Sequence, residues 1–536
     1  MPQRILLGDE AVALAAVHAG ISTAYAYPGT PSTEILEYLL EHKEREGGPH
    51  AAWCANEKTA YEEALGTCFA GRRSIVCMKH VGLNVAADPF VNSALVSMHG
   101  GLVVAVADDP GMHSSQNEQD SRWYADFARV PCLEPATQQE AYDMTREAYD
   151  VSERFGLPVM LRLVTRLSHS RTNVQVGEMR GENALQKAPK ADTWVLLPGN
   201  ARRQWSSLVA RQKDVLAWSE ASRWNLLNLR PGRTLGVITT GIARNYYREN
   251  VGAMKEAPSH LHIGTYPIPE AHVRALAAHC DEILVLEDGY PYVERMMRGI
   301  LPGKTKIMGR MSGELPPTGE LSPEIVRAAL GLPALPVLDL DGLLLPNRPP
   351  QLCQGCPHGH SYNALKEALE GMGATMVTAD IGCYTLGALP PYSSIESCVC
   401  MGASIGMAKG AAEAGFEHVV AVIGDGTFLH SGTASLADAA AADTPMTVLI
   451  LDNQATAMTG VQDPLIASSR LQAIVEGVGV KPEHLKIVDA HPRKVHETAE
   501  VLRKEMAHRG LSVVIAVREC KVAHAKHARI PEAVGR

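Results

Sequence analysis

The chain has 536 residues, of which 46% are hydrophobic and 20% charged, so it can bury a large core and is not a disordered chain. At roughly 100–200 residues per domain, this length suggests about three domains. Lys and Arg number 50 against 59 Asp and Glu, and the resulting net charge of −9 argues against general nucleic-acid binding, which needs a basic surface.

Short β-rich apolar runs alternate along the chain with stretches of helical character that are rich in Ala, Leu, Glu and Lys. Continuous apolar strands separated by helices are typical of parallel sheets covered on both faces. We therefore expect an α/β protein with mainly parallel sheets. Candidate helices include 33–43, 58–70 and 138–154, and candidate strands are 74–79, 102–107, 158–164, 234–239, 282–286, 376–379, 419–423, 447–451 and 512–517.

Two breaks divide this pattern. The stretch from 173 to 232 is polar and irregular, and a Pro/Leu segment ends at 344–350. The sequence therefore predicts three blocks, 1–172, 233–335 and 351–536, with 173–232 as a connecting arm.

The third block contains a motif at the ends of two predicted strands. Strand 419–423 runs into Gly424-Asp425-Gly426-Thr427, and strand 447–451 is followed by Asp452-Asn453. A glycine turn lets the backbone approach a bound anion, and the carboxyl ends of parallel strands are where α/β sheets bind ligands. The alternative is an ordinary turn between a strand and a helix. The arrangement resembles the thiamine-diphosphate fingerprint.

The same motif offers ligands for a metal ion. Asp425 has a carboxylate oxygen, Asn453 an amide oxygen and Ala455 a backbone carbonyl, which together with diphosphate oxygens would complete the shell of Mg²⁺. The helix that follows the glycine turn would help to neutralise the diphosphate.

Thiamine enzymes also need a carboxylic acid against the pyrimidine ring, and Glu57 is the candidate. It opens the helix predicted over 58–70. A desolvated carboxyl group there could donate a proton to the pyrimidine. The alternative is a helix-terminal Glu that the helix dipole stabilises.

The cysteines form a further pattern. Cys353 and Cys356 make a CxxC, Cys383 follows, and Cys520 lies near the C-terminus. Four such thiols could bind Zn²⁺ or one [4Fe–4S] cluster, and the spacing does not distinguish them. A nearby thiamine carbanion, which needs an electron acceptor, favours the cluster.

The other cysteines are expected in the core. No stretch of the sequence approaches the roughly 18 apolar residues of a membrane helix, and no signal peptide is recognised. We therefore expect a cytoplasmic protein. Cysteines in that compartment are not expected to form disulfide bonds. For the CxC of Cys398 and Cys400, core packing is favoured over a ligand pair. Five more cysteines are interpreted as buried small hydrophobic residues: Cys54, Cys68, Cys77, Cys132 and Cys280.

Taken together, these features resemble the indolepyruvate-type α subunits of the thiamine-dependent 2-oxoacid:ferredoxin oxidoreductase family. The resemblance covers nearly the whole chain. It rests on YPGTPSTEI (27–35), NEKTAYEEALG (56–66), MKHVGLNVAADP (78–89), CQGCPHG (353–359), DIGCYTLG (380–387), GDGTFLHSG (424–432) and LDNQATAMTG (451–460).

The resemblance implies a thiamine-diphosphate-binding fold. Block 1–172 would be a pyrimidine-binding domain, 233–335 a transketolase-C-like domain, and 351–536 a diphosphate-binding domain that carries the cluster cysteines. It also implies residue roles. Glu57, Thr30 and His80 would be catalytic; Glu57, His358, Asp380, Gly382, Gly424, Gly426, Thr427, Asn453, Met458 and Thr459 would bind the cofactor; Asp425, Asn453 and the Ala455 carbonyl would bind Mg²⁺; and Cys353, Cys356, Cys383 and Cys520 would hold one [4Fe–4S] cluster. For Thr30 the alternative is a helix cap, which Ser32 could also provide, and for the two histidines it is a structural role.

The implied reaction is oxidative decarboxylation of a 2-oxoacid, with an aryl pyruvate such as indolepyruvate or phenylpyruvate as substrate. Coenzyme A would capture the acyl group, and electrons would leave through the cluster to ferredoxin or another acceptor. The implied partner is a smaller γ-type subunit in an (αβ)₂ heterotetramer. The family's usual C-terminal ferredoxin-like extension, with two further CxxCxxCxxxCP runs, does not occur in this sequence, so at most one cluster is expected.

Two other functions remain open from the sequence. One is a non-oxidative thiamine-dependent decarboxylase or lyase with structural cysteines. The other is a zinc-stabilised binding or scaffolding subunit with a degenerate thiamine site.

Overall fold

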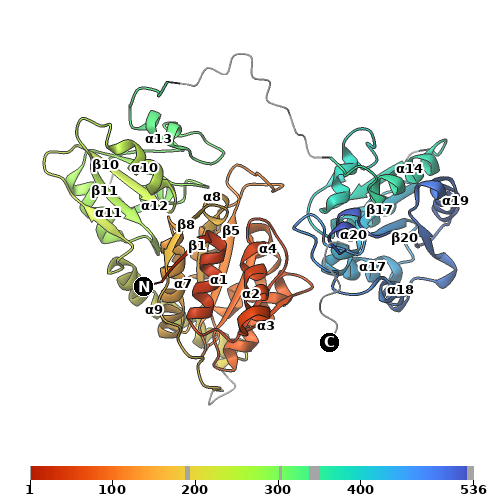
Figure 1. The fold of residues 1–536 in the computed structure, drawn as a ribbon, viewed down its shortest axis with the longest axis horizontal. Coiled ribbons are helices and arrows are strands. Elements are labelled where there is room, and N and C mark those ends of the chain that lie inside the picture. Colours follow the sequence, from red (N-terminus) through yellow and green to blue (C-terminus); the bar gives the residue numbers. More distant parts are fainter. Residues whose placement is uncertain (1, 187–192, 301–304, 337–350, 374, 528–536) are drawn as a thin grey trace. The chain divides into compact units, whose positions relative to one another are not determined.

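The computed structural model describes residues 2–186, 193–300, 305–336, 351–373 and 375–527. The chain forms two compact units, Met1–Asp339 and Leu340–Arg536 (Figure 1). The predicted Pro/Leu break at 344–350 lies outside the described residues. Among the residues described, no helix is both long enough and apolar enough to cross a membrane.

The first unit is built around a seven-stranded sheet with the strand order β12-β6-β7-β5-β4-β2-β3. All neighbours are parallel except the edge pair β12 and β6. Every residue of the central strands β4, β5 and β7 is buried, because helices cover both faces of the sheet. The strands are β2 (Thr23–Ala26), β3 (His50–Trp53), β4 (Ser74–Lys79), β5 (Leu102–Asp108), β6 (Cys132–Leu133), β7 (Val159–Val164) and β12 (Thr265–Tyr266).

The helices around this sheet begin at recognisable caps. The side chain of Asn56 accepts a hydrogen bond from Thr59 N–H at the start of α3, and Thr137 does the same for Glu140 N–H at the start of α7. The helices are α1 (Gly8–His18), α2 (Thr33–Glu46), α3 (Glu57–Phe69), α4 (His80–Val85), α5 (Ala87–Ser93), α6 (Arg122–Ala128), α7 (Gln138–Phe155) and α8 (Thr165–Ser168).

A two-stranded antiparallel ladder joins the N-terminus to the end of the first block. Strand β1 (Gln3–Leu7) pairs with β8 (Arg171–Gln175), with Leu7 opposite Arg171. This register brings the chain just after β1 close to the chain just before β8.

A second sheet of the first unit has the order β14-β13-β10-β11-β9. Its strands are β9 (Leu226–Asn228), β10 (Leu235–Thr240), β11 (Ser259–Ile263), β13 (Glu282–Leu286) and β14 (Lys306–Met308), and its helices are α10 (Ala243–Val251), α11 (Glu270–His279), α12 (Tyr292–Ile300) and α13 (Pro323–Ala329). The same segment supplies β12 to the first sheet, so 1–172 and 233–335 share a unit.

The predicted arm at 173–232 contains regular structure in its second half. It contains the 23-residue helix α9 (Pro198–Glu220), which buries Leu208, Val215 and Ser219. These three residues are spaced by seven and four positions, so they share one face of the helix while the other face stays polar. This polar face is what made the stretch read as a linker.

The second unit contains a six-stranded sheet in which all neighbours are parallel, in the order β16-β15-β17-β18-β20-β19. Alternate residues of β17 enter two separate cores: Val419, Ala421 and Ile423 one, Val420 and Val422 the other. Both faces of the sheet are therefore buried. The strands are β15 (Thr375–Ala379), β16 (Ser397–Cys398), β17 (His418–Gly424), β18 (Thr447–Asp452), β19 (Leu485–Asp489) and β20 (Ser512–Val517).

Helices cover this second-unit sheet as well. They are α14 (Pro357–Leu369), α15 (Ala403–Glu413), α16 (Asp425–Thr427), α17 (Thr433–Ala441), α18 (Ser468–Gly477), α19 (Val495–Met506) and α20 (Lys521–His527). The predicted α/β class with mainly parallel sheets is confirmed. All nine predicted strands are present, and their ends agree with the structure to within one residue.

Candidate functional site

Two buried carboxylates lie side by side at the carboxyl ends of β17 and β18. Gly424 pairs with Leu451 in the sheet, so the next residues, Asp425 and Asp452, are neighbours. Burial and the adjacent Asp452 carboxylate raise the pKa of Asp425 to about 8. The N–H of Gln454 donates to Oδ2 of Asp425 at 3.1 Å and to Oδ1 of Asp452 at 3.2 Å. Oδ2 of Asp452 is buried and has no hydrogen-bond partner within the described part of the chain.

The next residues complete a set of oxygen donors. Oδ1 of Asn453 accepts the N–H of Ala455 at 3.2 Å, and both residues are buried. The chain between them turns back at Gln454, whose φ is +57°. Carboxylate, amide and carbonyl oxygens around an unpartnered buried carboxylate oxygen fit a hard divalent cation such as Mg²⁺. The structure thus gathers the three predicted metal residues and adds Asp452. Asp452 lies in the sequence motif that follows strand 447–451, but no role was predicted for it.

His358 packs against this group from the start of α14. Its Nε2 lies 3.2 Å from Nδ2 of Asn453. Burial lowers the pKa of His358 to about 4, so the neutral ring accepts the hydrogen bond from the amide. His358 therefore orients the Asn453 amide through its NH₂ group, while Oδ1, which accepts from Ala455 N–H, keeps a second lone pair for a metal ion.

A tyrosine that sequence reasoning did not single out shapes the glycine turn. A Cβ on Gly382 would lie 2.3 Å from Cε1 of Tyr384, and one on Gly424 would lie 2.6 Å from it, so both positions require glycine. The Tyr384 hydroxyl donates to Asp380, whose pKa burial raises to about 6. This ring is the physical reason for the two glycines.

The remaining predicted cofactor residues divide into two groups. Thr427 donates to the carbonyl of Ile381 at 3.0 Å, and a Cβ on Gly426 would meet Thr456 at 3.4 Å, so both lie in the turn. Met458 is 51% exposed, and Thr459 hydrogen-bonds to Gln462 within its own loop. The structure thus brings Gly424, Gly426 and Thr427 to the carboxylates and leaves Met458 and Thr459 on an adjacent loop.

The four predicted cluster cysteines lie near one another. Burial first, and then the neighbouring thiols of Cys356, Cys520 and Cys353, raise the pKa of the Cys383 thiol to about 12. Burial also raises the pKa of Cys356, again with a contribution from Cys353 and Cys520. Thiols within electrostatic reach of one another are compatible with an iron–sulfur cluster. Among the described residues, no three of these sulfur atoms lie within 4.8 Å of one another, as the ligands of a single Zn²⁺ ion would.

Hydrogen bonds connect the set of four cysteines to the loop that carries Asn453 and Ala455. The N–H of Cys520 donates to the carbonyl of Asn453 at 2.8 Å, and Cys520 packs against Ala455. Lys521 donates from Nζ to the carbonyl of Gln354, inside the CxxC turn, at 3.1 Å. The segment around Cys520 carried little sequence motif, and its position becomes evident only in the fold.

The prediction that Cys398 and Cys400 pack in the core is wrong, because both are exposed. Cys398 ends β16, a two-residue strand at the edge of the sheet, where one side has no neighbouring strand. The five cysteines predicted to be buried are all buried.

In the first unit, three predicted residues follow neighbouring parallel strands. Thr30 follows β2, Glu57 follows β3 and begins α3, and His80 follows β4 and begins α4. Since the carboxyl ends of parallel strands meet at one edge of a sheet, all three lie at the same edge.

Local packing explains how Glu57 and His80 are held. Glu57 is buried, and a Cβ on Gly82 of α4 would lie 2.5 Å from its Oε1, so the glycine leaves room for the carboxyl group. His80 is buried with Nε2 3.3 Å from the carbonyl of Asn117, and its Nδ1 has no hydrogen-bond partner among the described residues.

Ser114 links Thr30 to Lys79, a residue with no predicted role. The carbonyl of Thr30 accepts from the Ser114 hydroxyl at 3.4 Å, and Lys79 Nζ donates to the Ser114 carbonyl at 2.7 Å. Burial lowers the pKa of Lys79 to about 8.

Ser32 is the N-cap of α2 but makes no capping bond through its side chain, so its alternative role as a cap is not observed.

Two family models match the chain. One, described as "Thiamine pyrophosphate enzyme, C-terminal TPP binding domain", matches residues 380–516. The other, described as "Pyruvate flavodoxin/ferredoxin oxidoreductase, thiamine diP-bdg", matches residues 14–197. The first match contains the paired carboxylates, and the second contains Thr30, Glu57 and His80.

Similar curated proteins span most of the chain. Indolepyruvate oxidoreductase subunit IorA of Archaeoglobus fulgidus is 35% identical, with 98% of this chain and 87% of the relative covered. The proteins of the same name from Methanothermobacter thermautotrophicus and Thermococcus kodakarensis are 37% and 34% identical, covering 97% and 96% of this chain and 87% and 85% of the relatives.

A solved structure supports the fold. The 2-oxoglutarate:ferredoxin oxidoreductase from Magnetococcus marinus, determined with 2-oxoglutarate, coenzyme A and succinyl-CoA bound, is similar with a TM-score of 0.51 and 17% identity. The similarity covers 61% of this chain and 65% of that chain. With the two family matches, it confirms the predicted thiamine-diphosphate-binding fold.

Proposed function

Because the chain belongs to the IorA family of indolepyruvate oxidoreductase subunits, we propose that it is the thiamine-dependent subunit of an enzyme that oxidatively decarboxylates a 2-oxoacid to acyl-CoA and CO₂. The name of the relatives supports an aryl 2-oxoacid such as indolepyruvate or phenylpyruvate as the substrate. Coenzyme A as acyl acceptor, and a smaller γ-type subunit in an (αβ)₂ heterotetramer, follow the resemblance of the motifs.

The observation that carries this proposal is the pair of strand ends at Asp425 and Asp452–Asn453, which fits a cation and a diphosphate. Asp425, the amide oxygen of Asn453 and the carbonyl of Ala455 would bind Mg²⁺, and Asp452 would add negative charge. Thiamine diphosphate held by these residues would supply a nucleophilic carbanion and an electron sink for the decarboxylation. Gly424 and Gly426 let the backbone approach the diphosphate, and His358 fixes the rotamer of Asn453.

Glu57 is proposed as the pyrimidine partner. Glu57 is buried against Gly82, and a carboxyl group held there could exchange a proton with a ring nitrogen of the pyrimidine. The hydroxyl of Thr30 and the imidazole of His80 lie at the same sheet edge, where they could orient a substrate carboxylate and keto oxygen.

Cys353, Cys356, Cys383 and Cys520 are proposed to hold one [4Fe–4S] cluster, which supplies a one-electron acceptor when bound. The hydrogen bond from Cys520 to Asn453 supports a short path between this group and the metal loop. Electrons would then pass to ferredoxin or to another acceptor.

The test is anaerobic co-expression with the γ-type subunit, followed by a panel of 2-oxoacids with coenzyme A and a dye acceptor. We expect iron and thiamine in the purified protein and dye reduction that requires both an aryl 2-oxoacid and coenzyme A. Release of an aldehyde without dye reduction would instead identify a non-oxidative decarboxylase. Zinc at one per chain with no thiamine would identify a binding subunit.

Glu57→Gln tests the acid–base role within the same assay. We expect turnover to fall by more than ~100-fold, within the usual range for loss of general acid–base catalysis, while thiamine content is retained. Glu62→Gln is the matched control, because Glu62 is exposed on the same helix and pairs only with Lys58 among its described contacts. Unchanged turnover in Glu57→Gln would refute the assignment.

A further inference from the structure

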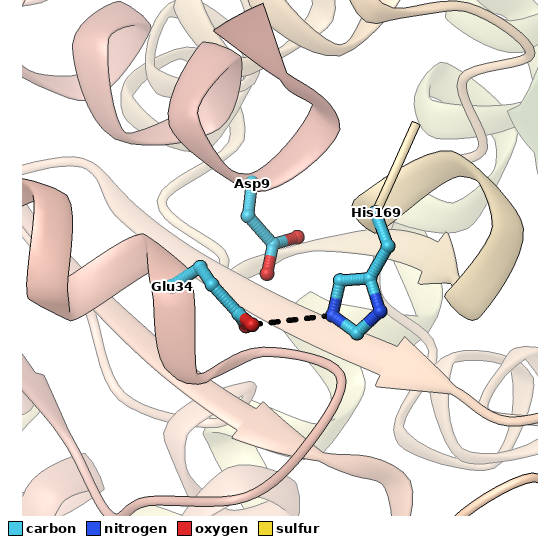
Figure 2. Close-up of side chains that lie close together, drawn as sticks. All are labelled: Asp9, Glu34 and His169. Atoms are coloured by element: carbon cyan, nitrogen blue, oxygen red, sulfur yellow. Dashed lines mark ion pairs between the residues drawn. The ribbon is translucent and has the colours of Figure 1, made fainter. Parts of the chain in front are cut away.

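A second cluster of metal-ligating side chains lies in the first unit. The β1–β8 ladder, with Leu7 opposite Arg171, brings Asp9 and His169 to the same end, since each lies two residues beyond the paired positions. The first turn of α2 adds Glu34. One ligand atom from each of the three side chains lies within 4.8 Å of the other two (Figure 2).

Asp9 is the unusual member of this group. Its side chain is fully buried, and neither carboxylate oxygen has a hydrogen-bond partner among the described residues. Figure 2 shows the carboxylate directed toward the space between Glu34 and His169. The buried Ser168 hydroxyl is close enough to lower the pKa of Asp9, but its geometry falls short of a full hydrogen bond. A buried carboxyl group with so few donors is costly, and buried charges are normally paired or bound to metal ions. In the absence of a cation, burial raises the pKa of Asp9 to about 8.

The spacing of the other two ligands suits a metal ion. Nε2 of His169 lies 3.4 Å from Oε1 of Glu34, which is longer than a usual charge-assisted hydrogen bond, although the contact still raises the pKa of His169 and lowers that of Glu34. Two ligand atoms bound at about 2.0–2.1 Å to a tetrahedral ion lie about 3.4 Å apart. The second oxygen of Glu34 is also buried and has no hydrogen-bond partner in the segments that the structure describes. The side chains of His169 and Glu34 are 36% and 34% exposed, which gives an ion a route from solvent.

We propose that Asp9, Glu34 and His169 form a binding site for a divalent transition-metal ion, with Zn²⁺ as the best match to one nitrogen and two oxygen ligands. Three protein ligands leave a fourth position for water. The ion would join the starts of α1 and α2 to the turn before β8. Since α2 begins just after Thr30, it would also stabilise the segment that carries this residue. The proposal does not depend on the proposed reaction.

The test uses the full-length protein and Zn²⁺ itself. Wild type, Asp9→Asn and Glu34→Gln are compared for zinc bound per chain and for the change in Tm on zinc addition. Glu44→Gln, an exposed position on α2, is the matched control. Because the cysteines can also bind zinc, the difference between the variants and wild type is the quantity that matters.

We expect both site variants to bind one zinc fewer per chain, or to bind it more than ~10-fold more weakly, and to lose the rise in Tm. The control should match wild type. Anomalous diffraction at the zinc edge should place the ion between the three side chains, apart from any iron. Equal zinc binding in all four proteins, or no zinc density there, would overturn the proposal.

Discussion

The backbone N–H of Cys520 donates a 2.8 Å hydrogen bond to the carbonyl oxygen of Asn453. Cys520 belongs to the set of four predicted cluster cysteines, and Asn453 belongs to the loop that presents the metal ligands. Because the bond uses only backbone atoms, the thiol of Cys520 can be removed without breaking it. The two halves of the candidate site can therefore be tested separately.

Cys520→Ser should lose iron while it keeps thiamine diphosphate and magnesium. The serine hydroxyl is a poor ligand for a cluster that is held by thiolates, but the bond to Asn453 remains. The measurement is iron, thiamine and magnesium per chain after anaerobic purification, together with visible absorbance. Cys398→Ser is the matched control, since Cys398 is exposed at a sheet edge. Full iron content in Cys520→Ser would remove this residue from the ligand set.

Asp452→Asn should change stability and cofactor affinity in opposite directions. The substitution removes one of two adjacent buried carboxylates, so the protein without cofactor should become more stable by ~1 kcal/mol or more, seen as a Tm raised by a few degrees. The same change lowers the negative charge that attracts Mg²⁺, so the affinity for Mg²⁺ with thiamine diphosphate should fall. Thermal unfolding with and without cofactor measures both effects. A variant that is less stable without cofactor would contradict the paired-carboxylate account.

Gly82→Ala should impair turnover through Glu57. The added Cβ would lie 2.5 Å from Oε1 of Glu57, so the carboxyl group must move. A displacement of about 1 Å can cost ~100-fold in rate. Gly66→Ala on α3 is the control, because a Cβ there meets no atom within 4 Å and should stabilise the helix by up to ~1 kcal/mol. Wild-type turnover in Gly82→Ala would show that this contact does not position Glu57.

Stability should depend on pH through His260. Burial and the nearby Arg244 lower its pKa to about 3, and its Nε2 lies 2.9 Å from the hydroxyl of Thr239. Below pH ~6.5 the unfolded chain takes up a proton that the folded protein does not. The free energy of unfolding should therefore fall as the pH drops from about 6.5 toward 3, by up to ~1.4 kcal/mol per pH unit, with no contribution above 6.5.

The Tm of His260→Gln should accordingly fall by less than the Tm of wild type when the pH is lowered from 7 to 5. Exposed His50→Gln is the control and should follow wild type. If the plots of Tm against pH are parallel for all three proteins, His260 does not contribute to the pH dependence of stability.

The central strands could be predicted because burial on both faces gives continuous apolar runs, as in β5 and β20. Two-residue strands such as β6 and β16 could not, since two residues carry no periodicity. The strand-end residues Asp425 and Asn453 were found because their spacing reflects two adjacent strands. The roles of Asp452, Tyr384 and Lys79 were missed because they depend on packing between segments, which no local pattern encodes.

The pairing of β12 with β6 determines where the chain can be cut. A polypeptide shortened to the first 232 residues would lack 265–266 and expose the backbone of Cys132–Leu133 as an unpaired sheet edge, a recognised starting point for aggregation. Attempts to produce the N-terminal half as an isolated fragment should therefore extend to the end of the first unit, near residue 339.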